Sequence, residues 1–377
     1  MSAGRKIWTT SWKLGLCLLL LGWIFNTIFL KEARTSIGPQ VWAKYSWTEQ
    51  TQAAWRHGPP RLWSTLTMID PAALSLSVIL MGVTILLGIA RWRMVLRVQG
   101  FDLQWSRTTE ISLVAHFFNS FLLGSTGGDL MKAYYAARET HHKKTEAVVT
   151  VFVDRLLGLW AMLLFAGIMM LPNLSLLFGR SQFRPLALLI LGMLVACSGV
   201  VVVAFWGGVS RTWTGARTWL RRLPKGEWLE RSLNSCRQFG RAPFFVSRTL
   251  SISMLLNAVC VLQVLVLSQG LGLKVPWLVL FVTVPMIICI SALPITPSGL
   301  GVRENLFVLM LSSIGVPDTS ALSLSLLAYA GSLFWSLVGG IVYAMLKERH
   351  HLAEKELEQE ELSPPPSDER TNPGTVN

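Results

Sequence analysis

The sequence predicts an all-α fold, a polytopic bundle of membrane-spanning helices, and three observations support that prediction. Hydrophobic residues make up 52% of the 377-residue chain and charged residues only 15%, whereas soluble domains carry about 25% charged residues. The hydrophobic residues are gathered into blocks long enough to cross a bilayer. Two of these apolar regions are interrupted by polar, glycine-rich breaks. We therefore expect the core of this protein to face lipid rather than water.

Seven apolar blocks define the candidate helices, because crossing about 30 Å of hydrocarbon takes roughly 17–25 helical residues. The first block follows three basic residues, but no small-residue cleavage site comes after it. We therefore expect a retained first span rather than a signal peptide. The blocks are Leu14–Leu30, Ala72–Ala90, Ala147–Leu171, Leu186–Trp206, Leu250–Leu271, Val275–Leu293 and Thr319–Leu346.

The two breaks predict re-entrant segments, each made of two half-helices around a loop. The first runs over residues 110–138 and is interrupted at Gly124-Ser125-Thr126-Gly127-Gly128. The second runs over residues 275–315 and is interrupted between Ala292 and Gly301, a stretch that contains two prolines. With both segments folded back on themselves, the chain has about six full spans plus two re-entrant half-helix pairs.

The distribution of basic residues supports this topology. Of the 34 Lys and Arg residues, 24 fall on one side of the predicted membrane and 8 on the other. The basic side is expected to be cytoplasmic, which places both termini inside and the protein in the cell membrane. The two breaks then enter the membrane from opposite faces. That pattern is typical of an inverted repeat, which in transporters places binding sites at broken helices near the midplane.

Three regions follow from this organisation. Residues 1–71 hold the first span and a Trp-rich outer loop, which we expect to include an interfacial helix. Residues 72–346 form the membrane domain with both breaks. Residues 347–377 are acidic and proline-containing, which predicts a short helix that runs into a disordered cytoplasmic tail.

The first break carries residues suited to holding an anion. Gly127 and Gly128 allow a ligand to approach the main chain closely, and Asp129 suits the N-cap of the following half-helix. Lys132 lies three residues further on, on roughly the same helix face. Free backbone N–H groups and Lys132 could therefore bind a phosphate or carboxylate. The alternative is a helix-breaking turn whose lysine reaches toward water.

The second break places a cation at the start of a half-helix. Pro294 ends the preceding helix, Ser298 and Gly299 make the turn, and Arg303 lies in the first turn of the next helix. An arginine there calls for a nearby negative group, and Glu304 is the nearest candidate. An ionisable pair inside the membrane is a candidate functional site. The alternative is an internal arginine–carboxylate clamp that only pins the loop.

A third candidate is the pair Asp154-Arg155, near the start of an apolar block. Adjacent residues point in different directions on a helix, so at least one should face the bundle. His116 is interpreted as a hydrogen-bonded packing residue. The sequence has no metalloprotease, nucleotide-binding or other recognised catalytic motif, so no metal or cofactor is expected. The net charge of +13 comes without a nucleic-acid-binding motif, so no nucleic-acid partner is expected.

The residues around both breaks resemble the lysylphosphatidylglycerol synthase transmembrane-region family, a flippase-like membrane domain. The first resemblance is FFNSFLLGSTGGDLMKAYYAARE followed by VFVDRLLGL, and the second is LPITPSGLGVRENLF. The likeness covers about residues 75–346. The matching positions are Asn119, Gly127, Gly128, Asp129, Lys132, Asp154, Arg155, Pro294, Gly299, Gly301, Arg303 and Glu304. The chain departs from the family pattern at Leu123, where proline is common, at Lys132, where Arg is more usual, and at Asp154, where Glu is more usual.

The resemblance implies lipid handling, and translocation of a lipid headgroup is the best-known role of this domain. We expect an anionic membrane lipid to bind at the two loops through Lys132 and Arg303, with Asp129, Asp154 and Glu304 balancing those charges. Aminoacyl transfer is not expected, because only a short acidic tail follows the last span. The alternatives are a membrane-embedded lipid-modifying transferase and an accessory scaffold of a lipid or glycan assembly complex. The sequence is also compatible with a partner membrane protein or with a homo-oligomer.

Overall fold

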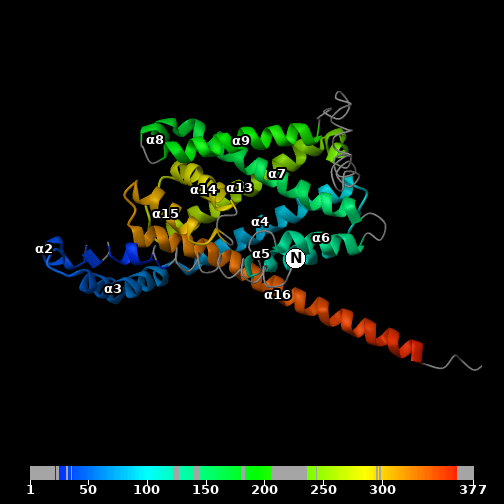
Figure 1. Cartoon of the computed structure of the whole chain (residues 1–377), viewed down its shortest axis with the longest axis horizontal. Helices are drawn as coiled ribbons and strands as arrows, with labels where there is room; N and C mark the ends of the chain where they lie inside the picture. Colours follow the sequence, from blue (N-terminus) through cyan, green and yellow to red (C-terminus); the bar gives the residue numbers. More distant parts are fainter. Residues whose placement is uncertain are drawn as a thin grey trace, which may run out of the picture.

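The computed structural model describes residues 22, 25–30, 33–34, 36–121, 127–139, 144–179, 183–205, 236–242, 244–293, 296 and 299–362. Every regular element within these residues is a helix. Most of the long helices run side by side along one direction, as Figure 1 shows. The predicted all-α membrane bundle is therefore confirmed.

Five helices are long and apolar enough to cross a membrane, and each corresponds to a predicted block. The first predicted span, Leu14–Leu30, lies largely outside the described residues. The predicted block Ala72–Ala90 stops too early, because its helix continues through Arg91 to Val98. The five spans are α4 (Pro71–Val98), α7 (Lys144–Met170), α9 (Arg184–Phe205), α13 (Phe245–Gly270) and α16 (Asp318–Leu362).

Both breaks separate pairs of shorter helices. The first pair is α5 (Trp105–Phe121) and α6 (Gly127–Glu139), and the second is α14 (Trp277–Ser291) and α15 (Val302–Ser312). At 1.5 Å per residue, α14 spans about 22 Å and α15 about 16 Å, too short to cross the hydrocarbon region. The helices of each pair pack against each other, so both pairs are hairpins. Residues 122–126 of the first loop lie outside the described residues.

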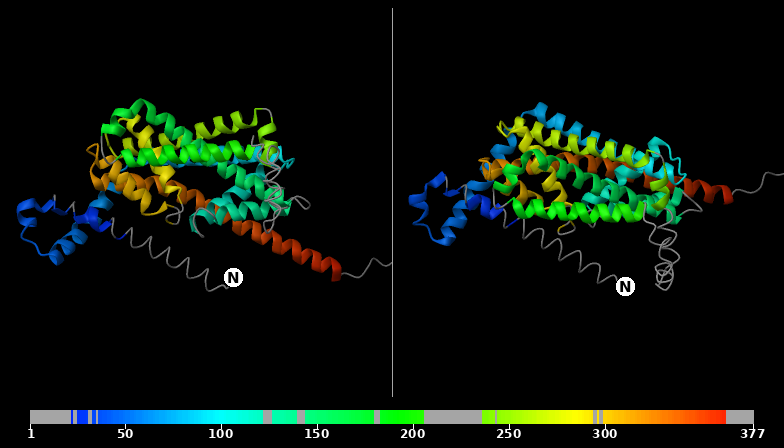
Figure 2. Two further views of the ribbon diagram at one scale, coloured as in Figure 1. Left: turned by 45° about the horizontal axis from the view of Figure 1, so that its top comes forward. Right: turned by 90° about the horizontal axis from the view of Figure 1, so that it is seen from above.

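The elements form two units of the same order, α4–α7 and α13–α16, each a span, a hairpin of half-helices and a second span. The units run in opposite directions, since the N–H of Asp70 before α4 donates to the carbonyl of Gly270 at the end of α13, 3.1 Å away. The packing is exchanged between them: α5 packs on α16, and α14 packs on α7. Accordingly α6 and α15 lie toward opposite ends of the bundle (Figures 1 and 2). The predicted inverted repeat is present in this arrangement.

The largest buried cluster explains why α14 lies inside the bundle. Its sequence, WLVLFVTVPMIICIS, is apolar on all sides, and a helix of that kind is stable only when it is surrounded. Fully buried side chains from neighbouring helices enclose it, including Leu163 of α7, Ile190 of α9 and Leu267 of α13. The first half-helix of the second hairpin, α14, is therefore held in the bundle by apolar packing.

Two helices lie beyond the end of the bundle at which α4 begins (Figure 1). They are α2 (Pro39–Trp42) and α3 (Trp47–Thr67), and α3 packs against α16. Ser46 caps α3, with the Ser46 N–H donating to the Glu49 carboxylate over 2.8 Å. The short helices η2 (Leu171–Asn173) and α8 (Leu174–Gly179) connect α7 with α9 at the same end.

Candidate functional site

The tip of the first hairpin is closed by a contact between its two helices. The side-chain oxygen of Asn119 on α5 accepts a hydrogen bond of 2.9 Å from the backbone N–H of Gly128 on α6. A Cβ atom at Gly128 would lie 2.0 Å from the carbonyl oxygen of Ala115. Glycine is required there because the backbones of α5 and α6 meet without room for a side chain.

The sequence predicts Asp129 as the N-cap of α6, and this prediction is wrong. The helix already begins at Gly127, so Asp129 lies within its first turn. Its carboxylate forms an ion pair with Arg155 of α7. The first-turn position still favours a negative charge, because the exposed N–H groups of a helix start carry partial positive charge. Asp129 thus ties the start of α6 to α7.

Asp154 joins three helices from a buried position on α7, where it is 5% exposed. One carboxylate oxygen accepts a 2.8 Å hydrogen bond from Nε of Arg91 on α4. The other lies 3.6 Å from Nζ of Lys132 on α6. Lys132 also lies 4.6 Å above the ring of Trp92, a favourable cation–aromatic contact. The predicted candidates Asp154 and Lys132 are therefore neighbours, and Arg91 completes the group.

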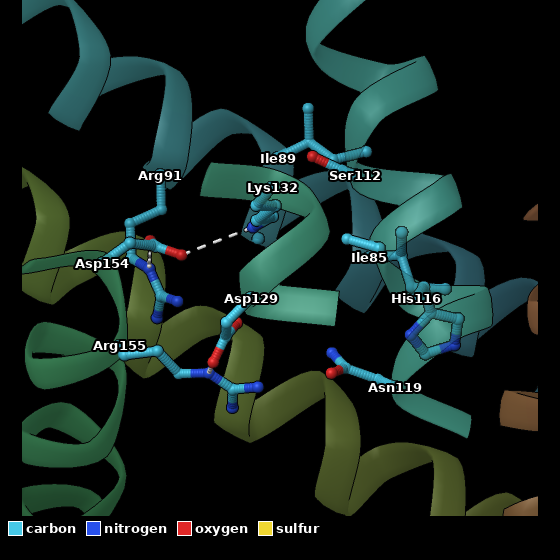
Figure 3. Close-up of a pocket in the computed structure, with 12 residues that line it drawn as sticks. Ile85, Ile89, Arg91, Ser112, His116, Asn119, Asp129, Lys132, Asp154 and Arg155 are labelled. Atoms are coloured by element: carbon cyan, nitrogen blue, oxygen red, sulfur yellow. Dashed lines mark hydrogen bonds and ion pairs between the residues drawn. The ribbon is translucent and has the colours of Figure 1, made fainter. Parts of the chain in front are cut away.

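These charged side chains line one side of a cavity of about 190 Å³ inside the first unit, with Asn119 and His116 on the other side (Figure 3). Its described lining carries three cationic and two acidic side chains, an excess of one positive charge. Ser112 of α5 also lines it and is 7% exposed, and its hydroxyl has no hydrogen-bond partner among the described residues. Buried hydroxyls are normally paired, so this one indicates room for water or a ligand.

The second break forms a different arrangement around Glu304. Its helix α15 begins at Val302, so Arg303 lies in the first turn as predicted. The preceding Gly301 has a backbone conformation with φ 84° that favours glycine. Glu304 is fully buried. One of its oxygens accepts a 2.6 Å hydrogen bond from the N–H of Gly301, and the other forms an ion pair with Arg303. The adjacent acid thus supplies the negative group that Arg303 requires.

Arg303 also contacts α16. Its Nε lies 3.4 Å from the Ser325 hydroxyl, and its guanidinium carbon lies 4.3 Å from the Tyr329 ring centroid. Arg303 therefore pairs with its neighbouring carboxylate and also faces the polar side of α16. Arg303 and Glu304 do not line the cavity of the first unit. The structure therefore brings together the candidates of the first break and holds those of the second apart.

The remaining predicted positions of the second break are described in part. Pro294 and Ser298 lie outside the described residues. Gly299 has φ 69°, and a Cβ atom there would lie 2.8 Å from the carbonyl oxygen of Ser291. The turn that closes this hairpin therefore requires glycine at 299, in agreement with the predicted turn position.

Sequence reasoning missed the cavity roles of Arg91, Ser112 and His116. Arg91 falls just outside the predicted block Ala72–Ala90, and the sequence alone indicates a packing role for His116. His116 does pack, since its Nε2 lies 3.2 Å from the carbonyl oxygen of Ser332, but it also lines the cavity. Helical spacing could have identified Ser112 and His116. They precede the predicted candidate Asn119 by seven and three residues, which puts all three on one helix face.

The titratable residues show no arrangement for a metal ion within the described part of the chain. No group of three or more His, Cys, Asp or Glu side chains comes close enough together there. The described cysteines, Cys197, Cys236, Cys260 and Cys289, are free thiols. The charged cluster around the cavity combines three cations with two carboxylates, a set suited to binding an ionic group.

Comparison with known proteins supports the resemblance seen at the two breaks. The profile of the family described as the lysylphosphatidylglycerol synthase TM region matches residues 46–340. A UPF0104 membrane protein of Methanothermobacter thermautotrophicus is 24% identical over 286 residues, which cover 70% of this chain and 82% of that protein. The family match includes both breaks and begins earlier than expected, at α3 rather than α4.

Proposed function

Because the chain belongs to the lysylphosphatidylglycerol synthase transmembrane-region family, we propose that it binds the anionic headgroup of a membrane lipid and moves it across the bilayer. The observation that carries this proposal is the cavity at the first break, with its excess positive charge and its unpartnered Ser112 hydroxyl. Ionisable side chains inside a membrane bundle are energetically costly, and they characteristically mark substrate or ion pathways. The acyl chains would stay in the surrounding lipid.

Lys132 is the contact to which we assign the headgroup. Its ammonium group has three donors, and its salt bridge with Asp154 spans 3.6 Å, longer than a close charge-assisted hydrogen bond. It is therefore able to turn toward a phosphate in the cavity while staying near its carboxylate. Arg91, held against Asp154 at 2.8 Å, contributes positive potential from a fixed position.

A reconstituted transport assay tests the proposal. Purified protein is placed in vesicles that contain fluorescent phosphatidylglycerol or fluorescent phosphatidylcholine, and the exchange of each lipid between leaflets is timed. We expect faster exchange of phosphatidylglycerol, and a loss of about tenfold in Lys132→Ala, because a hydrogen bond to a charged group contributes roughly 1.5–3 kcal/mol. Lys132→Arg should retain most of the rate. Lys274→Ala, an exposed lysine before α14, is the matched control.

Three outcomes bear on the assignment. A folded Lys132→Ala protein that exchanges phosphatidylglycerol at the parent rate would overturn it. Equal inhibition by inorganic phosphate and by glycerol phosphate would indicate a simple anion site rather than a lipid site. Mass spectrometry of the recovered lipids checks the alternative of a transferase, since a chemically altered lipid would favour an enzyme over a transporter.

A further inference from the structure

A polar stripe runs along one face of α16. It consists of Ser325, Tyr329, Ser332 and Ser336, which we call the α16 stripe. The spacings of four, three and four residues keep all four within about 60° of helix circumference, at 3.6 residues per turn. Ser325 and Ser336 are buried, so the stripe faces the interior of the bundle rather than lipid.

The two ends of the stripe contact the two breaks. At one end, Arg303 of the second break reaches Ser325 and lies over the ring of Tyr329. At the other end, His116 of the first hairpin contacts the carbonyl and the hydroxyl of Ser332, at 3.2 and 3.4 Å. One turn further along α5, Ser120 pairs with Ser336 through a 2.6 Å hydrogen bond between their hydroxyls.

His116 connects the stripe with the cavity, because it lines the cavity on one side and contacts Ser332 on the other. Tyr329 precedes Ser332 by three residues, about one helical turn. Polar side chains therefore recur at each turn of α16 between Ser332, which contacts His116 at the cavity, and Ser325, which contacts Arg303 at the second break. The otherwise separate breaks are linked through this single helix.

We propose that the α16 stripe is the path along which the headgroup passes between the cavity and Arg303, an inference that rests on the proposed function. A charged headgroup needs polar partners wherever it leaves water, and the hydroxyls of the stripe supply them at each turn. Arg303 is suited to receive the headgroup. Its Nε donates to Glu304 and Ser325, and its Nη2 donates to Glu304. Its Nη1 makes no hydrogen bond to any described residue and is therefore available. Ser332 and Ser325 are the positioning residues of this path.

Hydroxyls between membrane helices also serve ordinary packing, and two observations favour a path. The cavity at its start holds the buried Ser112 hydroxyl, which pairs with no described residue and is available to a headgroup oxygen. The stripe is also confined to the side of α16 that meets both breaks. Ser323, on nearly the opposite side of the same helix, is equally buried but donates only within its own helix, to the carbonyl of Thr319.

The test compares three serine-to-alanine variants of α16 in the vesicle assay, with lipid binding measured separately in nanodiscs that contain phosphatidylglycerol. In Ser332→Ala the backbone carbonyl keeps its contact with His116, so only the hydroxyl is removed. We expect Ser332→Ala and Ser325→Ala to bind phosphatidylglycerol within about twofold of the parent and to exchange it about fivefold more slowly, the effect of one neutral hydrogen bond. Ser332→Thr should restore the rate, and Ser323→Ala should leave both properties unchanged.

The result separates this inference from the proposed function. Parent exchange rates in Ser332→Ala and Ser325→Ala, with a slow Lys132→Ala, would overturn the path and leave the headgroup site standing. A parent rate in Lys132→Ala would overturn the site itself. Slower exchange that Ser323→Ala shows equally, with the same loss of thermal stability, would assign the stripe to packing and also overturn the path.

Discussion

Asp154 faces two cations from a position that is 5% exposed, with Arg91 at 2.8 Å and Lys132 at 3.6 Å. Asp154→Asn would leave both cations buried without their counter-charge. Removing one member of a buried ionic group typically costs about 3–5 kcal/mol. We therefore expect Asp154→Asn to lower the free energy of unfolding by about 3 kcal/mol, measured as a lower Tm of the purified protein in detergent.

Asp129→Asn provides the comparison. Its ion pair with Arg155 is far more accessible, with the two side chains 28% and 49% exposed, and pairs of that kind contribute up to about 1 kcal/mol. The Tm of Asp129→Asn should accordingly fall much less than that of Asp154→Asn. Equal losses in the two variants would contradict the view that burial makes Asp154 the structural centre of the cluster.

Gly128 is the residue at which the first hairpin tolerates no side chain. In Gly128→Ala the new Cβ would lie 2.0 Å from the backbone oxygen of Ala115, which cannot rotate away. Overpacking of this kind costs about 1–3 kcal/mol or more. We expect a loss of Tm and of phosphatidylglycerol exchange together, since the hairpin tip carries the cavity. Gly192→Ala in α9 is the control: apart from its two chain neighbours and the backbone of its own helix, nothing lies within 4 Å of its new Cβ, and its Tm should be unchanged or higher.

At the residue level, the sequence predicted most of the charged cluster but not its geometry. The family motifs and the rarity of charge inside apolar blocks both pointed to Lys132 and Asp154. Arg91 escaped because hydropathy ends a block at the first charge, whereas α4 continues through it to Val98. The pairing of Arg91 with Asp154, 63 residues away, makes that continuation possible, and no local pattern contains such a contact.

Among the elements, the half-helices were predictable because glycine and proline interrupt apolar runs, and both hairpins are present. The ends of the helices were less predictable from the sequence. Helix α5 begins at Trp105, six residues before the apolar stretch that starts at Ile111. Its polar first turns are held by Arg107, which pairs with Glu110 and with Glu139 at the end of α6. Paired charges extend membrane helices beyond the limits that hydropathy alone gives.

The start of α3 is an element whose stability should depend on pH. The Glu49 pKa is lowered because the backbone N–H and the hydroxyl of Ser46 donate hydrogen bonds to its carboxylate. The ionised form therefore stabilises the first turn above the ordinary pKa of a glutamate, and that contribution is lost as the pH falls through the lowered value.

Hydrogen exchange measures this effect. At neutral pH, Glu49→Gln should exchange its first-turn amides of α3 faster than the parent, once intrinsic rates are corrected. The difference should disappear once the pH falls below the lowered pKa of Glu49, where the carboxylate is protonated. A difference that persists in acid would mean that the Glu49 charge does not hold the cap.

For the whole molecule, the charge count and the position of the breaks predicted two opposed units, and the packing gives a physical reason for that arrangement. Each unit lends its first half-helix to the last span of the other, α5 to α16 and α14 to α7. Both hairpins therefore bury part of their surface across the boundary between the two units. Arg91 and Lys132 lie inside helices rather than in loops. Without them, 22 basic residues fall on the predicted cytoplasmic side and 8 on the other side, so the orientation prediction is unchanged.

That orientation is tested by cysteine labelling at the two hairpin entrances, Ser106 at the start of α5 and Lys274 before α14, both exposed. Single cysteines are placed there after replacement of the five native ones. Lys274→Cys should react with a membrane-impermeant maleimide in intact cells, and Ser106→Cys only after permeabilisation, because basic loops stay cytoplasmic. Ala161→Cys, buried in α7, should react in neither case. Reaction of both from one side would contradict the opposed units, whereas reaction from opposite sides in the reverse sense would keep the units and invert their orientation in the membrane.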